Sequence, residues 1–231
     1  MRYKTIDYKN HTKSTIDGVT MHAKEKTLEI KQCPRHGFFR GDECQCGNQG
    51  RFVLSGYKAE KLGKIISGAL RHFPQELGLQ MDEHGWISID DLEKAIVAKY
   101  PWARRYHIDA MFDTDEKGRY ERVDNKVRAR YGHSVDIDLD YPKSEHEMLF
   151  YGTSEEEADR ILEIGLKPVN QHYVHLSKSI EEAVKVACIR TEHPVIISVD
   201  AKKAKESGIK ILDAGPVCLT THVPPEFIRI E

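Results

Sequence analysis

Apolar residues change their spacing along the chain, and these changes divide it into three zones. The first zone is polar and rich in cysteine, and it ends near Phe52. The second zone begins with apolar residues that recur at helical spacing and share one face, namely Leu62, Ile65, Ile66, Ala69, Leu70 and Phe73. Pro74 follows and is incompatible with a continuing helix. We therefore predict an amphipathic helix that ends at about residue 73.

The rest of the second zone predicts two more helices and a hairpin. Asp90 and Glu93 have the spacing of a capping box at the start of a helix, and a further short helix is predicted over 102–112. After a turn at 117–118, apolar and basic residues alternate over 127–131, which predicts a strand. Helices followed by a small hairpin are typical of a winged-helix lobe.

The third zone, from about Glu145, alternates between helices and short strands. Ser154 and Ser179 each stand three residues before a glutamate, which predicts helix starts at both serines. The first of these helices should end at Gly165 and the second at about Arg190. Strands are predicted over 173–176, 195–199 and 209–212. The expected fold class is therefore α+β.

Composition indicates a soluble globular protein. Hydrophobic residues make up 39% of the 231 residues and charged residues 31%. No run approaches the ~18 apolar residues that span a bilayer, and the amino terminus lacks the apolar core of a signal peptide. We expect a cytoplasmic protein with no membrane partner.

The net charge of −2 is unevenly distributed along the chain. Residues 1–50 contain 9 basic and 6 acidic groups, residues 51–135 contain 15 and 13, and residues 136–231 contain 11 and 18. A polyanion such as RNA is therefore expected to meet the first 135 residues more readily than the rest.

Four potential metal ligands lie close together in the first zone. They are Cys33, His36, Cys44 and Cys46. Zinc takes such sets of thiolates and imidazole, and the metal can replace a missing hydrophobic core in a small knuckle. A closed site with four protein ligands would be structural. The alternative is that these are reduced surface cysteines with no metal.

Several short sequence words point to one family. They are GKIISGALRH (63–72), HGWISIDDL (84–92), VRARYGHS (127–134), LFYGTS (149–154), YVHLS (173–177) and DAGPVCLTTHVPPEFI (213–228). In this order and spacing they resemble the RNA 2′-phosphotransferase family, the NAD-dependent enzymes known from tRNA splicing. The resemblance covers about residues 55–230, so the cysteine module lies outside the part that all members share.

The resemblance implies a fold and a domain organisation. A winged-helix-like lobe that faces RNA would occupy residues 55–140, and an ADP-ribosyltransferase-like lobe that binds NAD would occupy 141–231. An amino-terminal extension with the zinc knuckle would occupy 1–54. This division agrees with the predicted helices and strands.

The family uses an Arg-His-Arg-Arg set, which falls here on Arg71, His72, Arg128 and Arg190. In the implied reaction the RNA 2′-phosphate attacks the nicotinamide ribose of NAD and expels nicotinamide. The neighbouring ribose hydroxyl then attacks the phosphorus, which releases 2′-OH RNA and ADP-ribose 1″,2″-cyclic phosphate. Arginine suits this chemistry because its planar, always charged fork pairs with phosphate oxygens. Histidine can donate to a phosphate oxygen or assist proton movement.

The resemblance also implies residues that face NAD. They are Tyr151, Gly152, Thr153, His175, Leu176, Ser177, Gly132, His133 and Ser134. The chain departs from the family pattern at several positions: Tyr151 and Tyr173 replace histidines, Gln171 stands where arginine is common, and Tyr131 stands where glutamine is common. These departures bear on NAD affinity and leave the four catalytic positions intact.

Two other functions compete with this interpretation. One is an ADP-ribosyltransferase that leaves its label on a nucleic-acid terminal phosphate or on a protein. Protein-modifying members of that wider fold group usually need a glutamate that activates the acceptor, and Glu226 lies near the end of the last word. The other is a non-enzymatic protein that binds nucleic acid through a winged helix and a zinc knuckle. The favoured prediction is an NAD-dependent 2′-phosphotransferase acting on RNA with an internal 2′-phosphate, with tRNA as the expected RNA.

Overall fold

A computed structural model describes residues 28–231 of the chain. The amino-terminal stretch on which the prediction of no export signal rests lies outside the described residues. The first described elements are β1 (Ile30–Cys33), β2 (Gly37–Arg40) and β3 (Arg51–Leu54), which form an antiparallel sheet in the order β2-β1-β3. The sequence pattern did not predict these short strands.

The amphipathic helix is confirmed as α1 (Gly56–Arg71), although it begins several residues earlier than the apolar pattern suggests. The Ser55 side chain accepts a hydrogen bond from the Lys58 backbone and so caps its start. Leu62, Ile66 and other apolar residues of the predicted face are fully buried. The helix ends at Arg71 and His72, just before Pro74, as the proline requires.

Two further helices complete the first half. α2 (Ile89–Lys99) is capped by Ser88 and not by Asp90, so the predicted capping box was placed two residues too late. Ser88 caps α2 because its hydroxyl accepts from the backbone of Asp91. α3 (Arg105–Asp113) confirms the third helix, although it begins three residues later and ends one residue later than the predicted range of 102–112.

The predicted hairpin is present as β5 (Tyr120–Val123) and β6 (Lys126–Ala129). A short strand, β4 (Ile87–Ser88), pairs with the other side of β6. The helices α1 to α3 pack with this sheet and with β1–β3 around one apolar core, whose fully buried members include Leu62, Ile96 and Ile108.

The second half combines two three-stranded sheets with three helices. One sheet has the order β12-β9-β7 and the other β10-β11-β8. Their strands are β7 (Met148–Ser154), β8 (Val174–Leu176), β9 (Pro194–Asp200), β10 (Ile211–Asp213), β11 (Cys218–Thr220) and β12 (Ile228–Ile230). The helices are α4 (Glu155–Ile164), α5 (Ile180–Ala187) and α6 (Ala201–Glu206). Phe150 of β7 and Ser177 exchange backbone hydrogen bonds, which join the two sheets.

Most helix boundaries here follow the sequence prediction. Ser154 and Ser179 cap α4 and α5, and Gly165 ends α4 with a φ of 78°. The end of α5 was predicted incorrectly, because the helix stops at Ala187 and Arg190 lies beyond it. The predicted strand at 209–212 is shifted to 211–213, while β11, β12 and α6 were not predicted.

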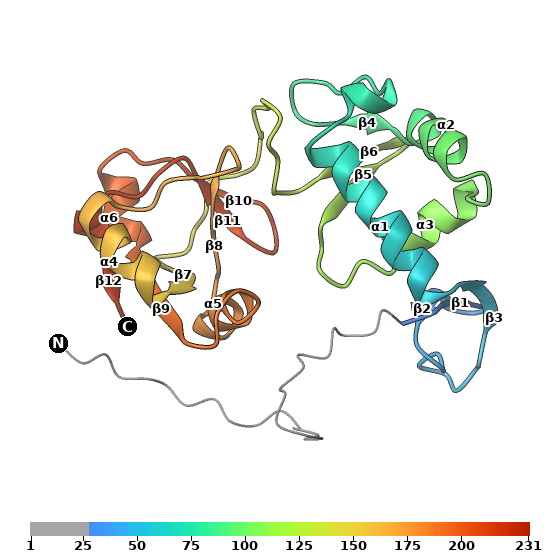
Figure 1. Ribbon diagram of the computed structural model, residues 1–231, viewed down its shortest axis with the longest axis horizontal. Helices are drawn as coiled ribbons and strands as arrows, with labels where there is room; N and C mark the ends of the chain where they lie inside the picture. Colours follow the sequence, from blue (N-terminus) through green and yellow to red (C-terminus); the bar gives the residue numbers. More distant parts are fainter. Residues whose placement is uncertain (1–27) are drawn as a thin grey trace.

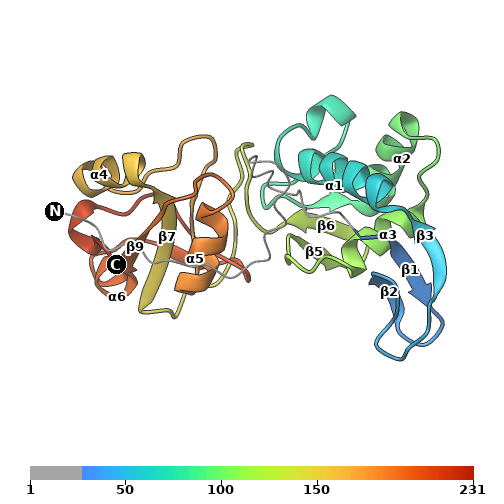
Figure 2. The same ribbon diagram turned by 60° about the horizontal axis from the view of Figure 1, so that its bottom comes forward.

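Figures 1 and 2 show the elements from β1 to β6 and those from β7 to β12 as two bodies side by side. The segment that follows β6 runs between them. Its Tyr131 ring meets the His175 ring at a centroid distance of 5.8 Å, and the His172 backbone N–H donates to the His133 carbonyl at 3.1 Å. Among the described residues no helix is long and apolar enough to cross a membrane.

Candidate active site

The carboxyl end of α1 presents Arg71 and His72 to the loop after β6. The Arg71 carbonyl accepts backbone hydrogen bonds from Ser134 at 3.0 Å and from Val135 at 3.3 Å. The His72 Nδ1 lies 2.9 Å from the Ser134 hydroxyl. This loop therefore fixes both the backbone and the imidazole at the end of the helix, although the two segments are about sixty residues apart in the chain.

Gly132 allows this loop to approach Arg71 closely. Its φ is 87°, a conformation that L side chains rarely adopt, and a Cβ there would lie 3.4 Å from the Arg71 guanidinium. The Tyr131 ring lies on another side of the same group, with the guanidinium carbon 5.0 Å from the ring centroid. Two consecutive residues of the loop therefore shape the space around Arg71.

Arg71 is a half-buried cation whose hydrogen bonds are incomplete. Its Nε and Nη2 are shielded from solvent and have no hydrogen-bond partner in the described structure. Burial lowers the pKa of Arg71 from its usual value. Leaving donors of a charged group unsatisfied costs free energy, and such a group is suited to receive an anion.

Two neutral histidines lie beside Arg71. Burial, followed by the charge of Arg71, lowers the pKa of His133 to about 3, and neither His133 ring nitrogen has a hydrogen-bond partner among the described residues. Burial and the charges of Arg71 and Arg190 lower the pKa of His175 to about 4. Both rings are held neutral near pH 7, so they can offer a donor or an acceptor to a ligand.

This pair of histidines predicts a loss of stability in acid. An unfolded histidine binds its proton near pH 6.5, whereas His133 and His175 bind theirs at about 3 and about 4. Between these limits unfolding takes up protons, so stability is expected to fall as the pH falls from 6.5 to 4, by up to ~1.4 kcal/mol per pH unit for each ring. Urea unfolding of wild type and His133→Gln across this range measures the effect. The variant should show a shallower slope, and an equal slope would contradict the assignment; the exposed His222→Gln is the control.

Arg190 lies in the turn after α5, where it is exposed. Its charge depresses the pKa of His175, and it opposes the rise that burial causes in the pKa of Tyr151. Arg190 therefore lies within electrostatic reach of the two predicted NAD-facing side chains, across the junction from Arg71. In the described part of the chain it forms no ion pair with a carboxylate.

Arg128 occupies a different environment. Its Nε donates to Glu121 at 2.9 Å and its Nη1 to Asp140 at 2.6 Å. The guanidinium carbon lies 4.5 Å from the ring centroids of both Trp86 and Tyr141. Its charge contributes to the depressed pKa of His133, so it is near the other members of the set. The alternation over 127–131 predicts a strand at Arg128 but does not predict this cage of two carboxylates and two aromatic rings.

Several predicted NAD-facing residues have contacts within the second half. The Thr153 hydroxyl donates to Glu157 at 2.6 Å and so supports the first turn of α4. Leu176 is fully buried in the apolar core. The Ser177 backbone pairs with Phe150, and its side chain is buried. His175 and Tyr151 are the members of this group that respond to Arg190.

Gly152 is required by the packing of α5 on β7. A Cβ at this position would lie 2.1 Å from the Ala183 carbonyl oxygen and 2.9 Å from the Ala187 Cβ. The backbone that approaches Gly152 closely is therefore that of α5, and the implied role of Gly152 in facing NAD stays a prediction.

The clash predicts that Gly152→Ala destabilises the protein by about 3 kcal/mol, since backbone must move to admit the methyl group. Thermal or urea unfolding measures this loss. Gly208→Ala isolates the cost of backbone conformation alone, because its φ is 92° while no atom lies within 4 Å of its added Cβ, and the loss in Gly152→Ala should be the larger. A Gly152→Ala variant as stable as wild type would show that α5 can shift without cost.

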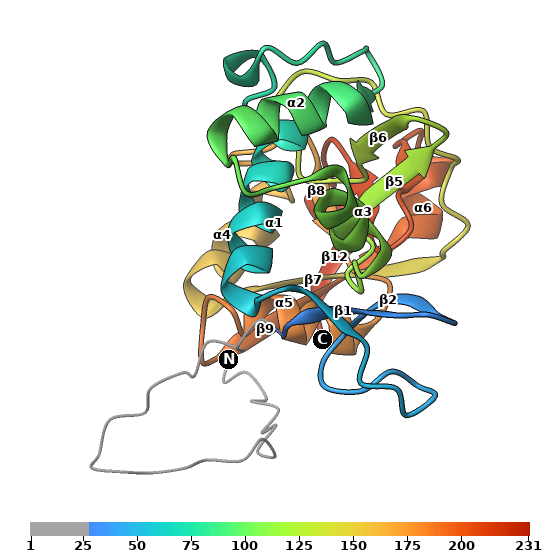
Figure 3. The same cartoon turned by 90° about the vertical axis from the view of Figure 1, so that its right-hand side faces the viewer.

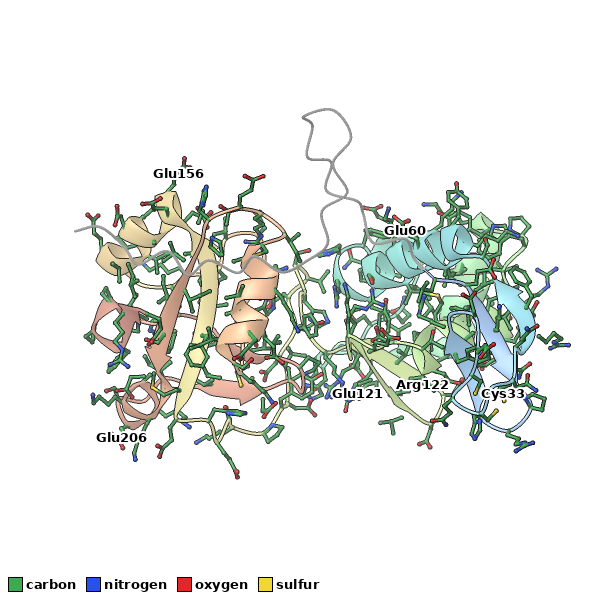
Figure 4. All side chains as sticks on the ribbon, turned by 90° about the horizontal axis from the view of Figure 1, so that it is seen from below. Cys33, Glu60, Glu121, Arg122, Glu156 and Glu206 are labelled. Carbon is green, nitrogen blue, oxygen red and sulfur yellow. The ribbon has the colours of Figure 1, made fainter. Side chains whose placement is uncertain are left out.

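The four predicted metal ligands do come together. Their ligand atoms all lie within 4.8 Å of one another, with Cys33 and Cys46 sulfurs 3.7 Å apart and the Cys44 sulfur 3.3 Å from the His36 Nδ1. Figure 4 shows Cys33 at the end of the molecule away from the second body, whereas Glu121 lies nearer the junction. The cluster is therefore remote from Arg71.

The model of the RNA 2′-phosphotransferase, Tpt1 / KptA family matches residues 57–221 of this chain. A probable RNA 2′-phosphotransferase 1 of Archaeoglobus fulgidus is 51% identical over 203 residues, which covers 87% of this chain and 94% of the relative. A probable RNA 2′-phosphotransferase of Methanosarcina barkeri is 49% identical, with 87% and 98% covered.

A shorter relative from Pyrococcus furiosus, also a probable RNA 2′-phosphotransferase, is 39% identical over 178 residues. This match covers 76% of the present chain but 97% of the relative. The match to the shorter relative therefore leaves about a quarter of the present chain uncovered.

Proposed function

Because the chain belongs to the RNA 2′-phosphotransferase family, transferases that remove a 2′-phosphate from RNA, we propose that it transfers this phosphate to NAD. NAD supplies the electrophilic ribose carbon and nicotinamide as the leaving group. The RNA 2′-phosphate forms a bond to this carbon in the first step. In the second step, the ADP-ribose hydroxyl next to that carbon attacks phosphorus, and the RNA 2′-oxygen leaves with a proton.

The observation that supports this proposal most directly is the unsatisfied guanidinium of Arg71. Two of its nitrogens are solvent-shielded, and its charge lies within electrostatic reach of the His72, His133 and His175 rings. Arg71 and His72 would hold the substrate phosphate in both steps. Arg190, and Arg128 if it leaves its carboxylate partners, would stabilise the charge that gathers on phosphorus in the second step.

We assign NAD to the second body, at the face that carries Tyr151 and His175. The His133 and Ser134 loop would close over it from the first body. In this assignment residues 55–140 form the winged-helix-like lobe and residues 141–231 the ADP-ribosyltransferase-like lobe. The substrate would be RNA with an internal 2′-phosphate, tRNA foremost, in the cytoplasm.

The decisive experiment adds a short 2′-phosphorylated oligonucleotide and NAD to the protein. Release of nicotinamide together with 2′-OH RNA supports the proposal. With NAD labelled in its adenylate part, the label should leave the RNA as ADP-ribose cyclic phosphate. Label that remains on the polymer would identify the competing ADP-ribosyltransferase, and no nicotinamide release would refute an NAD-dependent reaction.

The cysteine module fits a structural zinc ion. Ligand atoms about 2.3 Å from a tetrahedral metal are about 3.8 Å apart, close to the 3.7 Å between Cys33 and Cys46. We therefore propose that Cys33, His36, Cys44 and Cys46 bind Zn²⁺ and that the ion fixes β1–β3.

Removal of the metal with a chelator is expected to lower the melting temperature by several degrees, because binding free energy contributes to folding. Metal analysis should give one zinc per chain in wild type and none in Cys33→Ser. Catalysis on a short oligonucleotide should persist in the metal-free protein. A metal content of zero in wild type would contradict the proposal.

A further inference from the structure

A groove of about 910 Å³ runs along α1 in the first body. At one end lies Arg40 of β2, and at the other lies His72 of the candidate active site. The opposite side is formed by the end of α3 and the turn before β5. Its lining residues come in part from α1, α3 and β2, which Figure 3 shows in the same body. The groove therefore connects the cysteine module with the site of the phosphate.

Basic side chains predominate on the rim of this groove. Arg40, Lys64, Lys117 and Arg119 line it, whereas only two acidic residues, Glu60 and Glu116, are among its lining residues. Lys64 is exposed and forms an ion pair with Glu60 at 2.6 Å, a contact that solvent weakens. Lys117 is exposed as well. The rim is suited to a chain of anions.

Positive charge continues from the groove to the active site. Arg40 is held in place by donation from its Nε to the Thr114 carbonyl at 3.0 Å. Burial and then the charge of Arg119 lower the pKa of Arg40. The charge of Arg119 also contributes to the lowered pKa of Arg71, behind burial. Arg119, whose Nε pairs with Asp115 at 2.7 Å, lines the groove as well and lies within electrostatic reach of both Arg40 and Arg71.

The floor of the groove is largely apolar and smooth. Ala59, Gly63 and Gly68 of α1 and Met111 of α3 contribute to it. The fourteen residues from Ala59 to His72 correspond to about 20 Å of helix. A surface of this length with an apolar floor and a basic rim can accommodate the bases and phosphates of several nucleotides.

We propose that this groove binds the RNA backbone that flanks the 2′-phosphorylated nucleotide. The inference rests on the proposed function, because His72 marks the end at which the reacting phosphate would sit. It also assigns a role to the cysteine module, whose Arg40 forms the far end of the groove and lies before the start of the family match at Tyr57. The module thus extends the RNA-binding surface.

The test compares two 2′-phosphorylated RNAs, a trinucleotide and a strand of about twenty nucleotides, bound to the full chain without NAD. Lys64→Ala/Lys117→Ala is expected to weaken binding of the long RNA about tenfold near 0.1 M salt. Its slope of log K against log salt should become shallower by about 1.4, since each phosphate contact to a single strand contributes about 0.7. The ratio of the affinities for the long and the short RNA should fall accordingly.

Lys94→Ala/Lys99→Ala is the matched control. Lys94 is exposed and paired with Asp91 at 2.9 Å, much as Lys64 is paired with Glu60, and Lys99 is exposed on α2 outside the groove. The control variant should bind both RNAs like wild type.

Three results would overturn the inference. One is an equal loss of affinity for both RNAs in Lys64→Ala/Lys117→Ala, which would indicate only a general field around the active site. Another is an equal loss for the long RNA in the control variant. The third is binding of the long RNA by Lys64→Ala/Lys117→Ala that equals binding by wild type. NAD-dependent turnover of the trinucleotide by wild type tests the proposed function separately, since it does not require the groove.

Discussion

Replacing Arg71 by methionine is expected to lower kcat/KM for a short 2′-phosphorylated RNA by about a thousandfold, while the melting temperature stays the same or rises. Steady-state kinetics of nicotinamide release and a thermal unfolding curve of the same preparations measure the two quantities.

The fall in kcat/KM and the unchanged or higher melting temperature have one physical cause. Arg71 is half-buried beside Tyr131 and Gly132, and two of its nitrogens have no hydrogen-bond partner among the described residues. In the free protein this desolvated charge opposes folding. When a phosphate occupies the site, the same donors are satisfied by the anion, and the cost is recovered as binding to the reacting group. Methionine keeps much of the packing volume and removes the charge.

Arg122→Met is the informative comparison. Arg122 lies in the same body, 37% exposed, and pairs with Asp113 and Asp109 on the surface. Its replacement should cost up to about 1 kcal/mol of stability and leave the kinetics unchanged. If Arg71→Met were markedly less stable than wild type, or retained most of its activity, Arg71 would be a structural residue and not the phosphate ligand.

Local signals in the sequence predicted much of the helical part of the fold. Ser154 and Ser179 cap helices through a hydrogen bond to a backbone N–H three residues ahead, so the whole interaction lies within four residues. Strands such as β1 and β12 depend on partners elsewhere in the chain and contain only three or four residues each. Their pairing could not be predicted from local spacing.

In the candidate site too, the local features could be predicted from the sequence, whereas the contacts between distant parts of the chain could not. The apolar pattern predicts that Arg71 and His72 end a helix, but nothing near them predicts that the loop at Ser134 fixes both. The bridging contact of Tyr131 with His175 was also missed, and the sequence contains no local signal for it. Alternation predicts that Arg128 lies on a strand, yet it cannot predict a side chain buried between Trp86 and Tyr141. The family resemblance implies only that the four catalytic positions act together, and the roles that it implies stay predictions.

Arg190→Ala is expected to convert the protein into one that completes the first step and stalls before the second. ADP-ribosylated RNA should become the main RNA species in a quenched time course with labelled NAD. The reason is that Arg190 is exposed beside Tyr151 and His175, where its charge is available for the phosphorus as negative charge gathers on it. Loss of one such contact slows a step by about a hundredfold or more. Arg160→Ala, an exposed arginine on α4, should behave like wild type.

Arg128→Ala tests whether Arg128 acts in the second step together with Arg190, as the family pattern implies. This change leaves Asp140 without its cation, leaves Glu121 with only the more distant Arg130 at 3.8 Å, and empties the space between two aromatic rings, so a loss of about 3 kcal/mol in stability should accompany any kinetic effect. Measured well below its melting temperature, the variant should also accumulate the ADP-ribosylated RNA if Arg128 reaches the phosphorus. If Arg190→Ala instead lost nicotinamide release and RNA product together, Arg190 would act in NAD binding or the first step, and the division of labour among the arginines would be wrong.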